Sequence, residues 1–385
     1  MNNDTNQKTN QKSGLRQSIR RRISENTSES SVDFGYRSLV VRTPKTSNRI
    51  NVRLALVAVS FIGAAAVLAI IAIGMGDYPV NIVQITKAIF GAPETNFHRI
   101  VVVEWRMPVA IAAVLFGALL GIGGAIFQSM TRNPLGSPDI IGFDAGSYTA
   151  VTLCMLVIGS TAYWNIAIAA ILGGVVTAFI VFMLARKNKK VESFRLIIVG
   201  IGVSATLGSL NNYLITRADV EDAMMVGFWS AGSINRVTWN SLIPVLIISA
   251  VVIVLVALLA PALKQMELGD DAATTQGVRV ERTRLALMVV GVATTALVTA
   301  AAGPISFIAL VAPQLARRIA GTPGVTVLGA AAVGAALLTF AHFLSLVIAQ
   351  FYRSIPVGLL TVSVGGIYMI WLLVREARKQ YGAPK

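Results

Sequence analysis

Long apolar segments separated by short polar ones follow one another along most of this chain. A helix that crosses a bilayer needs about 17–25 predominantly apolar residues. Ten segments reach or approach that length, at 54–75, 108–130, 140–159, 164–185, 195–215, 241–263, 284–302, 304–320, 325–349 and 356–374. The pattern predicts an all-α integral membrane protein with about ten transmembrane helices.

Two places depart from the simple pattern. The eighth segment is short and begins at Gly303-Pro304, so its boundary is the hardest to set. The fifth segment is followed by a polar stretch from Thr216 to Asp222 and then by Met224–Ile234. That last stretch has the length of a short re-entrant or interfacial helix.

The distribution of basic residues sets the orientation. Lys and Arg are enriched in the cytoplasmic loops of membrane proteins. If the N-terminus lies inside, ten crossings return the C-terminus to the same side. Basic clusters then fall only in predicted inner loops, at 186–190, 264–284, 317–318 and 375–379. The sequence therefore predicts an even number of crossings, with both termini in the cytoplasm.

Composition agrees with a membrane protein. The chain has 385 residues, of which 55% are hydrophobic and 13% are charged, whereas about a quarter are charged in soluble domains. The formal net charge is +15. A single cysteine, Cys154, excludes an internal disulfide and a multi-cysteine metal site.

The first 52 residues differ from the rest. They carry ten Lys or Arg against four Asp or Glu, including Arg20-Arg21-Arg22. Nucleic-acid binding is one interpretation of such a run. The segment has no aromatic platform on which bases stack, so we favour a disordered, basic cytoplasmic arm and expect no nucleic-acid partner. The sequence thus divides into this arm at 1–52, a ten-helix transmembrane domain at 53–378 and a short cytoplasmic tail at 379–385.

The apolar segments contain few ionisable residues, and only His342 is expected well inside one. Ion-coupled carriers commonly mark their ion routes with membrane-embedded Asp, Glu, His or Lys. The chain also lacks the G-x-x-x-x-G-K-[ST] loop that cradles nucleotide phosphates. A transporter without either feature takes its energy from another subunit, although sodium sites can be built from carbonyls and hydroxyls. A membrane enzyme ranks last, because no nucleophile–base pair and no cluster of metal ligands is recognisable.

One inner loop has the pattern of a short helix. It reads Leu268-Gly269-Asp270-Asp271-Ala272 and ends near Gly277. Acidic residues are stabilised at the positive end of a helix dipole, and glycine commonly follows a helix C-terminus. The residues alone leave open whether this helix belongs to a solvated loop or docks an energy-supplying partner.

Small residues crowd the second apolar segment. Gly117, Gly121, Gly123 and Gly124 fall within it. Because small residues let helix backbones approach closely inside a bilayer, we expect this helix to be packed among the others.

Several runs resemble signatures of the FecCD family, whose members are permease subunits of importers for iron–siderophores and vitamin B12. The matching runs are Arg106-Met107-Pro108, Gly124-Ala125-Ile126-Phe127-Gln128, Asn133-Pro134-Leu135, Pro138-Asp139-Ile140-Ile141-Gly142, Leu268–Val278, Gly303-Pro304-Ile305, Val311-Ala312-Pro313-Gln314 and Ile355-Pro356-Val357-Gly358. Together they cover about residue 53 to residue 378.

The resemblance implies the fold of the vitamin B12 permease, which is that of a type II ABC importer. It also implies partners: a second permease chain, two ATPase subunits that hold ATP and Mg²⁺, and an external substrate-binding protein. The chain itself would be no enzyme and would bind no cofactor. Its ATPase-coupling loop would be formed by Leu268, Gly269, Asp270, Asp271, Ala272 and Gly277.

The chain departs from the family pattern at three points. Val109 replaces the arginine of an R-L-P-R run, Gln314 replaces the histidine of a PH pair, and an acidic residue late in the ninth segment is missing near His342. Candidates for docking the binding protein are accordingly Arg106, with Arg99 and Arg353 as weaker ones.

The family also implies a translocation path lined mainly by the fifth helix and its neighbours. Candidates are Asn211, Asn212, Tyr213, Met224 and Trp229, whose alternative roles are interhelical hydrogen bonding and core packing.

Residues 229–239 resemble the W-x-AGS-[LI]-N-x-x-TW run of the ferric enterobactin subgroup. This favours a catecholate siderophore as cargo, a heterodimer over a homodimer, and a bacterial cytoplasmic membrane. Another iron chelate, haem or vitamin B12 is the alternative cargo, and an ion-coupled secondary transporter is the alternative from a different class.

Overall fold

The computed structural model describes residues 38–42, 47–93, 95–139, 142–187, 190–191 and 193–380. Contacts divide the chain into two units, Met1–Ala55 and Leu56–Lys385. In the first unit, β1 (Ser38–Arg42) pairs antiparallel with β2 (Ser47–Asn51). This hairpin occupies the end of the segment that the sequence assigns to a disordered arm. The Arg20–Arg22 cluster, residues 188–189 and residues 381–385 lie outside the described residues.

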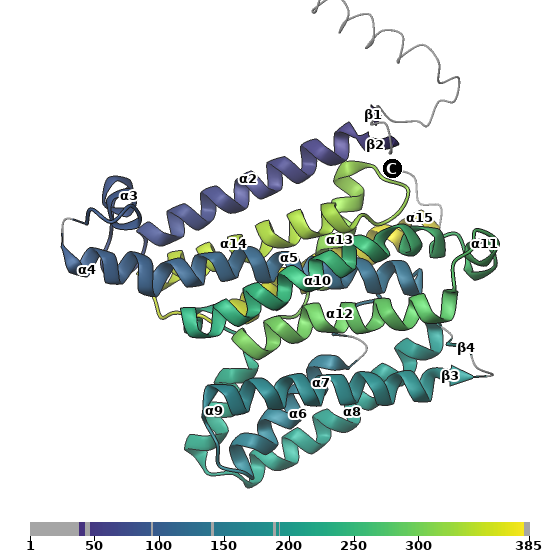
Figure 1. Ribbon diagram of the computed structural model, residues 1–385. Coiled ribbons are helices and arrows are strands. Elements are labelled where there is room, and N and C mark those ends of the chain that lie inside the picture. Colours follow the sequence, from purple (N-terminus) through teal and green to yellow (C-terminus); the bar gives the residue numbers. More distant parts are fainter. Residues whose placement is uncertain are drawn as a thin grey trace, which may run out of the picture. The chain divides into compact units, whose positions relative to one another are not determined.

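The rest of the description is almost entirely helical. Its elements, in chain order, are α2 (Val52–Gly74), α3 (Ile82–Ile89), α4 (Asn96–Arg99), the π-helix η1 (Ile100–Arg106), α5 (Met107–Thr131), α6 (Phe143–Leu156), α7 (Tyr163–Ala185), β3 (Arg186–Lys187), β4 (Lys190–Val191), α8 (Ser193–Arg217), α9 (Val220–Ser230), the 3₁₀-helix η2 (Ile234–Arg236), α10 (Trp239–Met266), α11 (Asp270–Thr275), α12 (Val280–Ala302), α13 (Ile308–Ala320), α14 (Val327–Phe351) and α15 (Val357–Gln380). Each of the ten predicted apolar segments contains one of these helices (Figure 1).

Seven helices within the described residues are long and apolar enough to cross a membrane: α2, the continuous helix 96–131, α7, α8, α10, α12 and α14. Three predicted spans fall short of that test. With 14 and 13 residues, α6 and α13 rise about 20 Å each, whereas the hydrocarbon core is about 30 Å thick. In α15 the apolar part is limited to Val357–Trp371, which is shorter than the candidate membrane-spanning helices. The expected helices are present, but their lengths do not establish ten crossings.

The second predicted helix is an interior element, as expected from its glycines. The helix α5 packs against α10, α12, α13 and α14. A Cβ on Gly117 would lie 2.3 Å from the carbonyl oxygen of Gly334, and one on Gly121 would lie 2.1 Å from that of Ala330. Backbone-to-backbone contact between α5 and α14 therefore requires glycine on α5.

The helices α6, α7 and α8 form a second group. They pack against one another, and α7 connects the group to α12 (Figure 1). Gly146 of α6 lies so close to α7 that a Cβ would be 2.0 Å from the Thr177 hydroxyl oxygen. Close packing of α6 on α7 therefore requires glycine at position 146.

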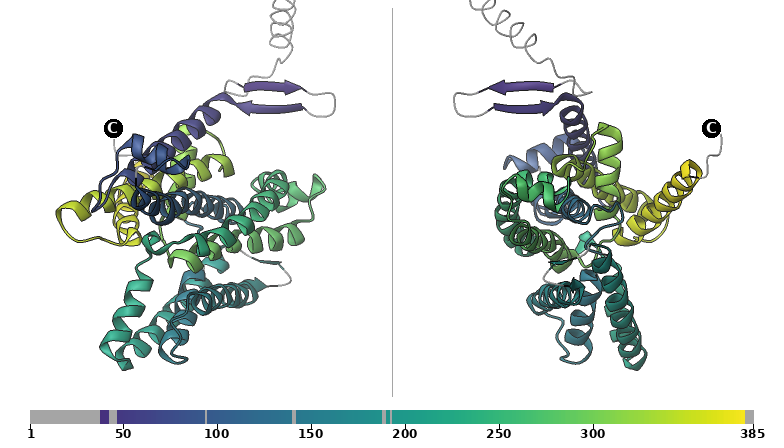
Figure 2. Two further views of the ribbon diagram at one scale, coloured as in Figure 1. Left: turned by 60° about the vertical axis from the view of Figure 1, so that its left-hand side comes forward. Right: turned by 90° about the vertical axis from the view of Figure 1, so that its right-hand side faces the viewer.

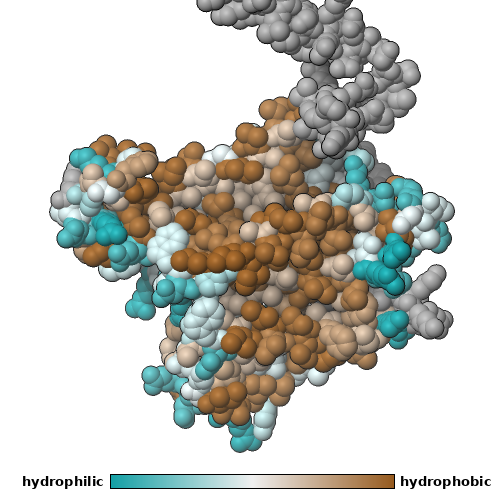
Figure 3. Space-filling model, in the orientation of Figure 1, coloured by the Kyte–Doolittle hydropathy of each residue, from teal (hydrophilic) through white to brown (hydrophobic). Residues whose placement is uncertain are grey.

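Large apolar side chains are exposed along the outer helices. On α10 they include Ile243, Ile247, Val251, Val254 and Leu258. Figure 3 shows that apolar residues cover the middle of this face, while hydrophilic residues gather at its two ends. Such a surface is unstable in water and is matched to hydrocarbon, so the chain is a multi-pass membrane protein.

The two ends of the Leu56–Lys385 unit carry different elements. One end holds α11 and the β3–β4 turn, and the other holds α3, α4 and α9 (Figure 1). The basic loops belong to the α11 end, which the sequence assigns to the cytoplasm. We call these the inner and the outer end.

Two carboxylates that the sequence did not single out, Asp139 and Asp144, are buried between helices. Asp139 Oδ2 accepts a hydrogen bond from the Phe307 backbone N–H at 3.2 Å, and Thr299 Oγ1 donates to Asp144 Oδ1 at 3.5 Å. The other oxygen of each carboxylate is buried without a hydrogen-bond partner among the described residues. Both groups therefore lie at the break between α12 and α13, because the loop before α6 folds back between helices distant in sequence.

Candidate coupling and translocation surfaces

The inner helix α11 is defined by both of its ends. Gly269 precedes it with φ +118°, and Asp270 and Asp271 occupy its first turn. At its C-terminus, Gly277 has φ +88°, its N–H donates to Thr274 O, and the Val278 N–H donates to Ala273 O, both at 3.0 Å. This pair of bonds is a Schellman motif. The predicted short helix and the role of Gly277 after its end are confirmed.

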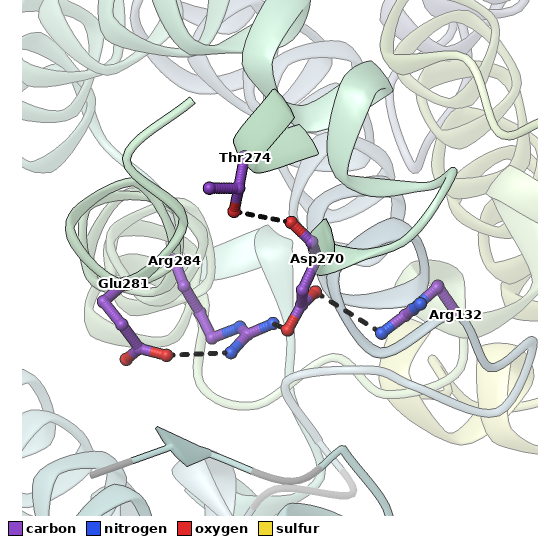
Figure 4. A network of polar contacts seen from close by, with 5 residues as sticks. All are labelled: Arg132, Asp270, Thr274, Glu281 and Arg284. Atoms are coloured by element: carbon purple, nitrogen blue, oxygen red, sulfur yellow. Dashed lines mark hydrogen bonds and ion pairs between the residues drawn. The ribbon is translucent and has the colours of Figure 1, made fainter. Parts of the chain in front are cut away.

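The Asp270 carboxylate joins three helices (Figure 4). Its Oδ2 accepts from Arg284 of α12 at 2.8 Å, and its Oδ1 pairs with Arg132, the residue that caps α5, at 3.4 Å. Arg284 also pairs with Glu281 at 3.4 Å, and only 6% of its side chain is exposed. A nearly buried guanidinium needs a partner for its charge. Asp270 therefore links α11 to α5 and α12 through ion pairs, and we call this set of contacts the Asp270 tie.

A second tie lies one turn before α11. The Ser129 hydroxyl of α5 donates to Glu267 Oε1 at 2.5 Å. Glu267 also lies against the turn before α14, where a Cβ on Gly324 would be 2.3 Å from Glu267 Oε2. The loop that carries α11 is thus bound to α5 from both sides, and a movement of α11 would be passed to that interior helix.

What remains exposed on this loop forms a small inner surface. The side chain of Leu268 is exposed by 70%, and Asp271 is also exposed, as are Thr275 and Gly277. An exposed leucine next to an exposed aspartate is typical of a contact surface for another protein. The predicted coupling-loop residues Leu268, Gly269, Asp270, Asp271, Ala272 and Gly277 lie in and around α11, and their coupling role stays a prediction.

A buried amide pair connects α5 to α13. Gln314 Nε2 donates to Gln128 Oε1 at 2.6 Å, and Gln128 Nε2 donates to Leu310 O at 2.9 Å. Gln314 is the residue that replaces the family's histidine. In this chain the Gln314 amide donates the hydrogen bond, and this position carries no group that changes its charge with pH.

At the outer end, the three predicted docking arginines differ. Arg106 donates to Ile73 O at 2.9 Å and to Tyr78 O at 2.8 Å. It therefore holds the turn after α2 and is only half-exposed. Arg99 and Arg353 are exposed. These two side chains are more exposed than that of Arg106, and docking by any of the three stays a prediction.

Beside Arg106 lies a cavity of about 520 Å³, which Asp77, Asn235 and His342 also line. His342 is 4% exposed, and its Nδ1 has no hydrogen-bond partner among the described residues.

The helix α8 carries a polar face. Asn211 is 2% exposed, but Asn212 and Tyr213 are exposed. Thr206, Ser209 and Thr216 share the exposed side at spacings of three or four residues. Their hydroxyls bond to carbonyls of the same helix, which satisfies them without a partner helix. A hydroxyl- and amide-bearing stripe is poorly matched to lipid.

The two remaining path candidates lie on α9, which confirms the short helix predicted after the fifth span. Met224 is 56% exposed. Trp229 is 9% exposed, and its ring stacks on Tyr148 with centroids 6.4 Å apart. In this conformation Trp229 packs between α6 and α9 and lines no open surface.

Sequence reasoning missed Arg132, Arg284 and Glu267. All three stand in loops or helix ends where charged residues are ordinary, so nothing in the sequence marks their pairing. The only sequence signal for the Asp270–Arg284 pair is its short spacing of fourteen residues. One short helix and one turn separate the two residues, so the chain can fold back and bring them together.

A protein-family comparison matches residues 64–375 to the FecCD transport family. The ferric enterobactin transport system permease protein FepG of Escherichia coli is 44% identical over 329 residues, which cover 85% of this chain and 98% of that protein. The iron(3+)-hydroxamate import system permease protein FhuG of Bacillus subtilis is 34% identical over 75% of this chain and 88% of its own length.

The fold is also found among solved structures. A metal-chelate type ABC transporter in an inward-facing conformation aligns with a TM-score of 0.71 over 83% of this chain and 99% of that one, at 23% identity. At that identity the likeness concerns the fold.

Proposed function

Because the chain belongs to the FecCD transport family, we propose that it is the permease subunit of an ATP-driven importer for a ferric siderophore of the catecholate type. The observation that carries this proposal is the 44% identity to FepG over 98% of that protein's length. The proposed cargo, a catecholate siderophore, rests on the similarity of this chain to a ferric enterobactin permease.

The chain would cross a bacterial cytoplasmic membrane ten times, with both termini inside. Seven helices are long enough by themselves. The short helices α6 and α13 would cross together with non-helical residues that precede them, which include 132–139 and 303–307. The basic loops at the inner end support this orientation.

Energy would come from a partner. The sequence has no phosphate-binding loop, so ATP and Mg²⁺ would be held by two ATPase subunits and this chain would bind no cofactor. Leu268 and Asp271 would contact an ATPase, while the Asp270 and Glu267 ties would transmit its movement to α5, α10 and α12. ATP shifts the conformation only to the extent that the complex binds it differently in the two states.

The path would lie between this chain and a second permease chain. The exposed polar face of α8 is suited to it, because hydroxyls and amides bind a hydrated anionic chelate weakly and let it leave. A heterodimer is favoured by the ferric enterobactin-type run at 229–239. On the outer side, Arg99 and Arg353 would pair with carboxylates of a substrate-binding protein, and Arg106 would position the neighbouring turn.

The buried pair Asp139 and Asp144 supports a second candidate, an ion-coupled carrier. Ionisable residues at the break between helices are typical of ion routes. The two carboxylates have one unpartnered oxygen each, which gives this candidate a specific site to test.

Reconstitution of the complete complex in proteoliposomes distinguishes the two. We expect ⁵⁵Fe-labelled ferric enterobactin to accumulate inside only when ATP is supplied to the ATPase, and an ionophore to leave uptake unchanged. Accumulation driven by an ion gradient without ATP, abolished by Asp144→Asn, would establish the ion-coupled carrier instead. A preference for ferric hydroxamates, haem or vitamin B12 in the same assay would correct the cargo.

A further inference from the structure

An apolar groove lies between α13, α14 and α15. It has a volume of about 210 Å³, and its accessible lining is wholly apolar. Leu315, Leu337, Phe340, Leu360 and Val364 contribute to it. Thr361 also lines it, but its hydroxyl donates to Gly358 O at 2.9 Å and presents no free polar group.

The groove exists because α15 touches its neighbours over only part of its length. Near its start, a Cβ on Gly358 would lie 2.1 Å from Ala231 O, and one on Gly365 would lie 2.5 Å from the Phe307 side chain. Beyond this contact α15 leads away from the other helices toward its C-terminus, as the right-hand view of Figure 2 shows. Phe340, which lines the groove, is 48% exposed, so the groove opens at the surface of the chain.

The groove continues into an aromatic and basic mouth. Tyr368 lines the groove, and its ring lies 5.8 Å from that of Trp371. Two guanidinium carbons lie over the Trp371 ring, that of Arg318 at 5.7 Å and that of Arg375 at 5.3 Å. The Tyr368 hydroxyl is buried with no hydrogen-bond partner among the described residues. This mouth therefore brings two guanidinium groups and one buried hydroxyl together.

The mouth lies at the inner end of the bundle. Arg318 is in the last turn of α13, and Arg375 follows the apolar part of α15. Tyrosine and tryptophan are enriched where hydrocarbon meets headgroups, and the cytoplasmic leaflet carries the anionic lipids that attract basic residues. An apolar groove that ends in Tyr, Trp and two Arg at this depth has the chemistry of a phospholipid.

We propose that the groove between α13, α14 and α15 binds one anionic phospholipid of the cytoplasmic leaflet. One acyl chain lies in the apolar groove, and the phosphate contacts Arg318, Arg375 and the Tyr368 hydroxyl. The bound lipid fills the space between α15 and α14 and so holds α15 at its present angle. A second copy of the chain is less suited to this site, because its surface would have to bring a negative charge to the mouth.

Native mass spectrometry of the delipidated complex tests the proposal by titration with dioleoyl phosphatidylglycerol and with dioleoyl phosphatidylcholine. We expect one phosphatidylglycerol to be retained on this chain in preference to phosphatidylcholine. A basic residue near an anionic surface contributes about 1 kcal/mol. Arg318→Gln and Arg375→Gln should therefore each weaken retention about fivefold, and the double variant about 25-fold.

Two matched controls separate charge from shape. Arg282→Gln removes an exposed inner-end charge outside the mouth and should leave retention unchanged. Val364→Trp fills the groove without altering charge and should abolish retention, whereas Leu359→Trp, at a residue that does not line the groove, should not. Equal retention of the two lipids, or undiminished phosphatidylglycerol in the double arginine variant, would overturn the proposal.

A cysteine in the groove checks for a second copy. Cys154 is buried, so Val364→Cys in a Cys154→Ala background gives a single reactive thiol. We expect no cross-link from a maleimide–benzophenone probe on this thiol to the partner permease or to a second copy in the membrane. Efficient cross-linking through Cys at this position would show that protein covers the groove and would overturn the lipid assignment.

Discussion

At the scale of single residues, Asp270 and Asp271 are adjacent in sequence but serve different surfaces. Asp270 is bound to Arg284 and Arg132, whereas Asp271 is exposed on the first turn of α11. Successive residues of a helix are rotated by about 100° around its axis. When the side chain of Asp270 points toward α5 and α12, that of Asp271 therefore points toward solvent. Stability and partner binding can therefore be altered separately at this loop.

Charge reversal at the exposed position should act on the ATPase contact. We expect Asp271→Arg to weaken co-purification of the ATPase by about tenfold and to leave the thermal unfolding midpoint of the permease unchanged, because Asp271 makes no ion pair within the described residues. Pull-down from solubilised membranes measures the first, and fluorescence-monitored unfolding measures the second. Glu221→Arg on α9 at the outer end is the matched control. Unchanged ATPase recovery would remove Asp271 from the contact.

Neutralising the inward position should act on stability. In Asp270→Asn the nearly buried Arg284 loses its 2.8 Å ion pair, and we expect the free energy of unfolding to fall by about 1.5–3 kcal/mol, the range for a hydrogen bond to a charged group. Arg284→Met should cost less in the Asp270→Asn background than in the wild type, since the shared interaction is already gone. Additive losses in this double-mutant cycle would contradict the tie.

At the scale of elements, α5 is an interior helix because its glycines allow backbone contact with α14. We expect Gly121→Ala to destabilise the permease by about 1–3 kcal/mol through overpacking, because a Cβ there would lie 2.1 Å from Ala330 O. Gly63→Ala on α2 is the matched control, since nothing lies within 4 Å of its Cβ position. The two variants are compared by their unfolding midpoints in detergent, and equal midpoints would contradict the packing argument.

The polar face of α8 leads to a prediction about transport. Asn212→Leu should lower the rate of ferric siderophore uptake at least tenfold while expression and unfolding stay unchanged, because Asn212 is exposed and supports no internal contact of its side chain among the described residues. Asn165→Leu, the same change at an exposed position of α7, should leave uptake intact. Wild-type uptake in the Asn212 variant would mean that this face does not line the path.

At the scale of the whole molecule, the number of crossings depends on the short helices. In a Cys154→Ala background, single cysteines at Thr275, Arg317 and Arg375 should react with an impermeant maleimide only from the cytoplasmic side, and one at Arg353 only from outside. If α13 did not complete a crossing of its own, Arg317→Cys would label from outside and Arg353→Cys from inside. Labelling of intact and permeabilised cells decides between these patterns.

The sequence predicted the local features well. Each long apolar segment is a helix, because about 20 apolar residues in hydrocarbon must satisfy their own backbone hydrogen bonds. The helix at Asp270–Thr275 and its glycine end were also predictable, since dipole and cap depend on residues a few positions apart. The glycines of the second span correctly indicated an interior helix.

Other features required the folded chain. That Arg284 is buried against Asp270, that Arg106 is held by two backbone carbonyls, and that Asp139 meets Phe307 all depend on residues 14 to 168 positions apart. Hydropathy is averaged over neighbouring residues and carries no information on such contacts. The predicted segments 140–159 and 304–320 are therefore longer than α6 and α13, and the burial of Asp139 and Asp144 was not predicted.

The sequence by itself thus determined that this is a helical membrane protein with a capped inner helix, because those properties follow from neighbouring residues and the solvent. Only the tertiary structure decided which charges are partners, which arginines stay exposed and where a groove opens beside α15. Those properties arise when helices far apart in sequence approach to within a side chain's reach.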